Sequence, residues 1–127
     1  NKRMEEPADR LDPDDHRKES KPFASLIEAM MSFEPQVMGV MHSTIETTGP
    51  GLKALFERWN GPVMAYPETS SQIRRGIAGA VEPSVFAEHC RDWVERGVQI
   101  IGGCCGTTVD HIRAMVNELP DAIGGRS

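Results

Sequence analysis

The stretch Val98-Gln99-Ile100-Ile101-Gly102-Gly103-Cys104-Cys105-Gly106 is the most informative part of this 127-residue chain. Its apolar half, Val98 to Ile101, is typical of a buried strand, and it ends in two adjacent cysteines between glycines. Neighbouring side chains of a strand point to opposite faces, so both thiols can reach one target only if the backbone turns there. Glycines permit such a turn because they adopt backbone angles that other residues avoid. Two thiolates aimed at one point indicate part of a zinc site.

The rest of the chain predicts a repeated pattern of strands and helices. Apolar strands are expected at residues 37–41, 62–66 and 98–101, and amphipathic helices at residues 23–33, 51–59 and 83–96. A last helix follows the capping box of residues 107–110, and residues 49–51 are expected to form a turn. Apolar strands that alternate with amphipathic helices indicate a parallel sheet covered by helices. The sequence therefore predicts an α/β fold, either a partial barrel or a small open sheet.

Side chains suited to chemistry follow each of the expected strands. These positions are His42, then Tyr66 and Glu68, and finally Cys104 and Cys105. In α/β folds the residues that do chemistry lie at the carboxyl ends of the strands. His42, Cys104 and Cys105 are therefore expected to offer three ligands to a zinc ion, with the fourth position open. The alternatives are two packed thiols or a redox-active disulfide for the cysteines, and a surface position for His42.

Other side chains near these positions have more than one interpretation. Tyr66, Glu68 and Met41 are expected to take part in substrate binding. Glu68 is otherwise a solvated loop carboxylate, and Met41 is otherwise a core side chain. His111, in the first turn of the last helix, either contacts the ligands or packs against the cysteine loop. Cys90 lies on the apolar stripe of its helix and is expected to be a packed core thiol.

Composition limits the remaining possibilities. Residues 1–22 are charged and contain few large apolar side chains, which predicts a loop or a disordered arm before one domain at residues 23–127. The net charge of −5 argues against binding to nucleic acid or to an anionic membrane. The sequence shows neither a long apolar run nor a signal-peptide pattern. Three cysteines, two of them adjacent, make a poor disulfide framework, so we expect a reduced, cytoplasmic location.

Two segments resemble the end of the homocysteine S-methyltransferase family. The first is Gly102-Gly103-Cys104-Cys105-Gly106-Thr107-Thr108 with its surroundings from Pro83 to Arg113, and the second runs from Leu52 to Pro67. The resemblance covers about residues 23–119 and implies strands six to eight of a (β/α)8 TIM-type barrel. It also implies a zinc ion and methyl transfer to the sulfur of homocysteine, which gives methionine. In that family the methyl donor is S-methylmethionine, betaine or a methyl-corrinoid.

The chain departs from the family pattern at two positions near the expected site. The family holds zinc by the cysteine pair after the last strand and by one more cysteine after the sixth. Here the segment after the sixth strand reads Gly39-Val40-Met41-His42, so His42 is expected to replace the third thiolate. The residue after Tyr66-Pro67 is usually asparagine or aspartate, and here it is Glu68. Two thiolates and an imidazole leave a zinc centre neutral, which is expected to slow methyl transfer or to favour an activated sulfonium or corrinoid donor.

Three functional hypotheses follow from the sequence. The resemblance favours the zinc-binding C-terminal part of a thiol methyltransferase of methionine biosynthesis, with a small-molecule thiol and a methyl donor as its partners. Another chain or segment is then expected to complete the barrel. The alternative is a non-catalytic, truncated relative that acts as a metal-binding or interaction module. A redox-responsive dithiol is the third hypothesis.

Overall fold

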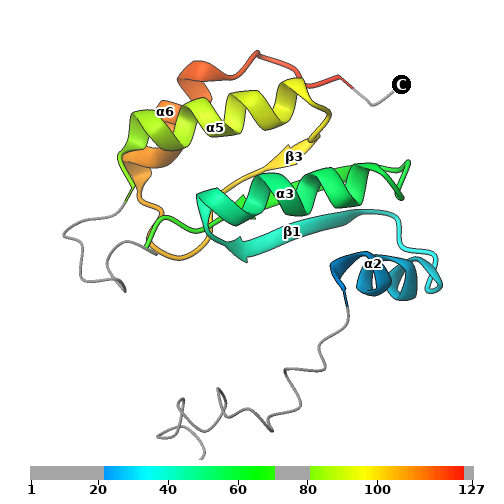
Figure 1. Cartoon of the computed structure of the whole chain (residues 1–127). Helices are drawn as coiled ribbons and strands as arrows, with labels where there is room; N and C mark the ends of the chain where they lie inside the picture. The colour runs from blue at the N-terminus through cyan, green and yellow to red at the C-terminus, as the bar shows by residue number, and fades with distance from the viewer. Residues whose placement is uncertain (1–21, 71–80, 125–127) are drawn as a thin grey trace, which may run out of the picture.

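The computed structural model describes residues 22–70 and 81–124 (Figure 1). The arm expected at residues 1–22 lies almost entirely outside the described residues and stays a prediction. The described strands are β1 (Met38–Ser43), β2 (Val63–Pro67) and β3 (Ile100–Ile101). The described helices are α2 (Phe23–Met31), α3 (Ile45–Phe56), α5 (Pro83–Glu95) and α6 (Val109–Glu118).

The strands form one parallel sheet in the order β1-β2-β3. Met38 of β1 pairs with Val63 of β2, and Met64 of β2 pairs with Ile100 of β3. Helix α3 connects β1 to β2, and α5 lies between β2 and β3 along the chain, as parallel neighbours require. The predicted α/β class with a parallel sheet is therefore confirmed. Because all three strands are parallel, their carboxyl ends lie at the same edge of the sheet (Figure 1).

Burial alternates along the strands, which separates the two faces of the sheet. Val40 of β1 and both Val63 and Ala65 of β2 are buried in one core cluster. The same cluster includes side chains from α3 and α5, among them Leu52, Leu55, Phe86, Cys90 and Trp93. On the other face, Ile100 is 39% exposed. Among the described residues, the helices therefore cover one face and leave the other open, although parallel sheets usually have both faces covered.

Helix α3 begins six residues earlier than the sequence predicted. It starts at Ile45 and runs through Gly49-Pro50-Gly51, which was expected to be a turn. The hydroxyl of Thr44 accepts a hydrogen bond from the Thr47 backbone N–H at 3.2 Å and so caps the first turn. Ile45 and Thr48 are buried in that turn. The cap and this burial outweigh the cost of an internal proline, which is about 3 kcal/mol.

The outer surface shows the second departure from the expected pattern. In α2 only Ile27 is buried, whereas Leu26 and Met30 on the predicted apolar side are 54% and 49% exposed.

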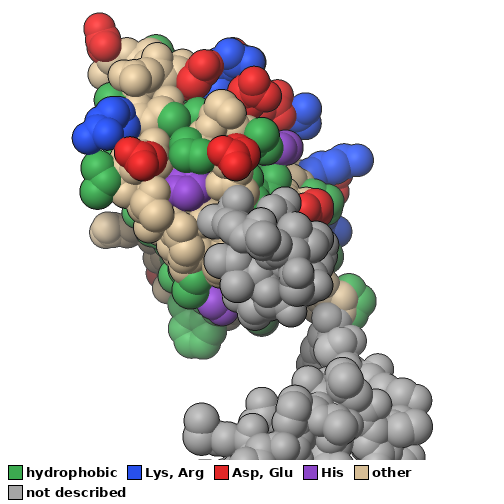
Figure 2. Space-filling model, turned by 90° about the vertical axis from the view of Figure 1, so that its left-hand side faces the viewer, with side chains coloured by type: hydrophobic (Ala, Val, Ile, Leu, Met, Phe, Trp, Pro, Cys, Tyr) green, Lys and Arg blue, Asp and Glu red, His purple; other side chains and the backbone are tan. Residues whose placement is uncertain are grey.

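On the face drawn in Figure 2, acidic and basic side chains are interspersed over the described part of the surface, with apolar side chains between them. Within residues 22–70 and 81–124, no helix combines the length and apolar character that crossing a bilayer requires.

Candidate metal centre

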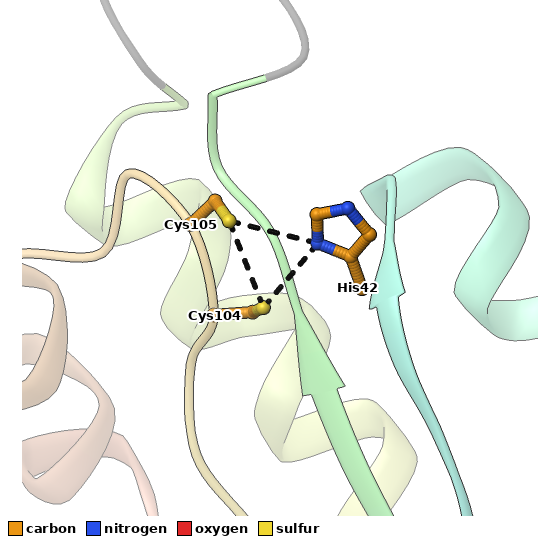
Figure 3. Close-up of side chains that lie close together, drawn as sticks. All are labelled: His42, Cys104 and Cys105. Carbon is orange, nitrogen blue, oxygen red and sulfur yellow. Dashed lines mark hydrogen bonds between the residues drawn. The ribbon is translucent and has the colours of Figure 1, made fainter. Parts of the chain in front are cut away.

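His42 lies within β1, because the strand extends to Ser43, two residues beyond the end that the sequence predicted. Met41 pairs with Tyr66 and Ser43 pairs with Pro67, so His42 is an extra residue that forms a bulge. Its φ of +54° is in the left-handed region, which is uncommon for residues other than glycine. This local turn, which depends on pairing with β2, points the imidazole toward the loop that carries the cysteines (Figure 3).

The cysteine loop, defined here as Gly102–Thr108, is attached to the end of β2 by backbone hydrogen bonds. The Cys104 N–H donates to the Pro67 carbonyl at 3.0 Å, and the Thr69 N–H donates to the Cys105 carbonyl at 2.8 Å. The predicted glycine turn occurs at Gly106, whose φ is +81°. A side chain at Gly106 would also collide with Thr69. Thr69 is fully buried, and its hydroxyl also donates to the Cys105 carbonyl at 3.4 Å. Sequence reasoning missed Thr69 because no motif marks contacts of this kind.

These two segments bring three ligand atoms together (Figure 3). The Nδ1 atom of His42 lies 3.6 Å from Cys104 Sγ and 3.5 Å from Cys105 Sγ, and the two sulfur atoms are 3.9 Å apart. Tetrahedral zinc with bonds of about 2.3 Å to sulfur and about 2.05 Å to nitrogen gives S–S edges of about 3.8 Å and S–N edges of about 3.6 Å. The three atoms therefore have the spacing of three corners of such a tetrahedron. Both thiols are free, since a disulfide would need sulfur atoms about 2.05 Å apart.

The environments of Cys104 and Cys90 give their thiols opposite properties. The hydrogen bond with His42, together with that from the Cys105 backbone N–H, holds the pKa of the Cys104 thiol below its usual range. Burial raises the pKa of the Cys90 thiol to about 12. Cys90 belongs to the core cluster, which confirms that it is a packed core thiol. Cys104 is therefore the better source of a thiolate, which is the form that binds metal.

Glu68 is buried beside the imidazole, so the interpretation as a solvated loop carboxylate was wrong. Its side chain is 1% exposed, and its Oε2 atom lies 3.6 Å from Nδ1 of His42. Its backbone N–H donates to the Ser43 carbonyl at 2.9 Å, which fixes Glu68 opposite the bulge in β1. Among the described residues, the group of ligand atoms within 4.8 Å of one another comprises His42, Cys104 and Cys105 without Glu68. Glu68 thus lies next to the three ligand atoms and adds negative charge there when ionised.

Tyr66 and Met41 lie near the same edge of the sheet. Tyr66 is half-buried, and its ring packs against Gly102, where an added Cβ would come within 2.9 Å of the ring. Met41 is 56% exposed, so the interpretation as a core side chain was wrong. It borders a pocket of about 420 Å³ that is also lined by residues of α3, away from the cysteine loop. A role for either residue in substrate binding stays a prediction.

The thiol pKa values predict the order in which the metal-free protein is alkylated. Because a lower pKa gives more thiolate at a given pH, iodoacetamide should modify Cys104 at a lower pH than an ordinary thiol. Cys90 should stay unmodified in the folded chain from about pH 6 to about pH 9. The His42→Ala change removes the main cause of the shift, so it should move the Cys104 profile to higher pH. Peptide mass spectrometry measures each profile.

The urea-unfolded chain is the control for this alkylation series, and there all three cysteines should share one pH profile. An identical Cys104 profile in the folded wild-type and His42→Ala proteins would contradict the stated cause of the pKa shift.

Comparisons with known proteins identify the family of the chain. The family model described as homocysteine S-methyltransferase matches residues 12–119. The selenocysteine methyltransferase of Astragalus bisulcatus is 37% identical over 63 residues, which cover 46% of this chain and 19% of that protein. The chain therefore matches about a fifth of the length of this curated relative. Since the family model covers most of the sequence, the chain belongs to the homocysteine S-methyltransferase family.

Proposed function

We propose that this chain carries the zinc-binding part of an enzyme that transfers a methyl group to homocysteine or to a related thiol or selenol. The observation that carries the proposal is the tetrahedral spacing of two thiols and one imidazole at the carboxyl edge of the sheet. Membership of the family supports it. The similarity to a selenocysteine methyltransferase supports a sulfur or selenium acceptor.

In this proposal, His42, Cys104 and Cys105 hold zinc and leave its fourth position open. Zinc lowers the pKa of a bound thiol, so that the acceptor is a thiolate at neutral pH and can attack a methyl donor. The lowered pKa of Cys104 favours the deprotonated ligand before metal binds. Cys105 and His42 are exposed, which leaves the three ligand atoms accessible to an acceptor and a donor.

Glu68, Tyr66 and Met41 would contribute to substrate binding. The Glu68 carboxylate lies 3.6 Å from His42 Nδ1 and would attract the ammonium group of an amino-acid thiol at the open position. When the carboxylate is ionised, solvent would screen this attraction little, because Glu68 is almost completely buried. Tyr66 and Met41 flank this edge of the sheet and would shape the acceptor's surroundings. Substitution of the third thiolate by His42 is expected to slow methyl transfer, or to favour an activated sulfonium or corrinoid donor.

We also propose that residues 23–127 supply strands six to eight of a (β/α)8 barrel. The open face of the sheet supports this, since parallel sheets usually have both faces covered. Strands β1 and β3 form the edges of the described sheet, and uncovered edges of this kind promote aggregation. Further βα units, from the same polypeptide or from a partner chain, would cover that face and pair with both edges.

A non-catalytic metal-binding or interaction module is the second candidate. The observation that favours it is the group of apolar side chains that α2 and the following loop leave exposed. These are Phe23, Leu26, Met30 and Phe33, at 44%, 54%, 49% and 81% exposure. This surface could bind a protein partner without any methyl transfer.

The metal part of the proposal predicts about one zinc ion per chain after dialysis. The Cys104→Ser change should lower bound zinc at least about tenfold, because it removes one of three ligands. The Cys90→Ala protein is the matched control and should keep its zinc, since Cys90 lies in the core. Elemental analysis of the folded proteins measures the ratio. Equal zinc content in the Cys104→Ser and wild-type proteins would rule out the assigned site.

The catalytic part predicts that this chain, together with the βα units that complete the barrel, transfers a methyl group from S-methylmethionine to homocysteine or selenocysteine. Mass spectrometry measures the product. Turnover by the wild-type protein should exceed that of the Cys104→Ser protein, which gives the background. The His42→Cys change should raise turnover, because a third thiolate makes the bound sulfur more electron-rich. Unchanged or lower turnover in an active His42→Cys protein would contradict that charge argument. If this completed wild-type protein binds zinc at one per chain yet shows no turnover above background, the interaction module is favoured.

A further inference from the structure

We propose that His111 is a positioning residue that holds the cysteine loop in its metal-binding shape. The proposal rests on the metal site assigned above. His111 lies in the first turn of α6, where its side chain is buried and its ring packs edge-on against Phe86, with centroids 5.5 Å apart and planes at 87°. Its ring nitrogens bond to two segments that are far apart in the sequence.

The hydrogen bonds of the imidazole define which nitrogen carries the hydrogen. The Thr108 backbone N–H can only donate, and it lies 3.1 Å from Nδ1 of His111. Nδ1 is therefore an acceptor, and the ring hydrogen is on Nε2. Nε2 donates that hydrogen to the carbonyl of Val81. The side chain thus links the start of α6 to the segment that precedes α5.

Backbone hydrogen bonds extend this link to Cys105. The Val81 N–H donates to the Thr69 carbonyl at 3.0 Å, and the Thr69 N–H donates to the Cys105 carbonyl at 2.8 Å. Three residues further along the chain, Thr108 returns to His111 through its N–H. The bonds therefore close a ring that begins and ends at His111 and contains the backbone of Cys105.

This ring restricts where the Cys105 sulfur can lie relative to His42. Cys105 Sγ is exposed and 3.5 Å from Nδ1 of His42, so packing around the sulfur does little to fix it. Its position depends on the backbone, and a metal site needs its ligands held within about 0.5 Å. The two bonds to Cys105 and Thr108 supply that restraint from opposite sides of the turn at Gly106.

Capping of α6 alone does not explain the arrangement. Thr108 and His111 form a capping box, in which the residue at His111 needs only an acceptor for the Thr108 N–H. The bond from Nε2 to Val81 adds a connection that a cap does not use. The two roles can therefore be separated, because each uses a different nitrogen of the same ring.

Two substitutions in the full 127-residue chain separate these roles. In His111→Asn the amide oxygen takes the place of Nδ1 and keeps the cap, but the side chain is too short to reach Val81. In His111→Gln the amide nitrogen takes the place of Nε2 and can donate to Val81. We expect zinc affinity to fall by about tenfold in His111→Asn and to stay within about threefold of wild type in His111→Gln.

Competition with a chromogenic chelator measures zinc affinity, and the thiolate-to-cobalt charge-transfer band after Co²⁺ substitution reports whether both sulfurs bind. His89→Asn is the matched control, since His89 lies on α5 against Trp93, and it should leave both readouts unchanged. Thermal unfolding of the metal-free proteins detects loss of fold. If His111→Asn fails to fold, hydrogen exchange on wild type replaces it, and zinc should then slow exchange at the Thr69 and Val81 amides.

The outcomes distinguish this proposal from the one on which it rests. A wild-type chain that binds Co²⁺ without a thiolate band overturns the metal site itself. A second outcome is that the wild-type chain binds the metal through both sulfurs and His111→Asn shows the same zinc affinity and the same thiolate-to-cobalt band. That outcome overturns only the role of His111. The role of His111 would also be overturned if the hydrogen-exchange rates of the Thr69 and Val81 amides were the same with and without zinc.

Discussion

Two backbone hydrogen bonds between the cysteine loop and the end of β2 determine the geometry on which the site depends. The bonds from the Cys104 N–H to Pro67 and from the Thr69 N–H to Cys105 hold the loop against the strand while it turns. In an extended chain, adjacent side chains would point to opposite faces. Here the turn leaves the two sulfurs 3.9 Å apart. Because parallel strands end at one edge, β1 delivers His42 to the same place.

The chemistry of the site follows from contrasts in environment between similar groups. Cys90 and Cys104 are the same residue type, but burial raises the pKa of the first thiol and hydrogen bonding lowers that of the second. In the proposed zinc site, the His42 imidazole in place of a third thiolate would remove one negative charge from the ligand set. The buried carboxylate of Glu68 stands 3.6 Å from that imidazole and, when ionised, places a negative charge beside the ligands.

The sequence predicted those features that depend on local patterns. Runs of apolar residues located β1, β2 and α5 to within about two residues, and the order of strands and helices indicated the parallel sheet. The predicted start of α3 was wrong because the cap at Thr44 precedes a Gly-Pro-Gly segment that resembles a turn. The bulge at His42 and the burial of Glu68 depend on pairing between β1 and β2. Interactions of that kind are set by tertiary structure, and no local pattern reports them.

The most direct test of the central claim is zinc K-edge X-ray absorption on the zinc-loaded chain, which counts the ligand atoms and measures their distances. We expect two sulfur scatterers at about 2.3 Å and at least one nitrogen at about 2.0 to 2.1 Å, with the remaining position held by nitrogen or oxygen. A shell without sulfur would contradict the account, because zinc would then lie away from Cys104 and Cys105.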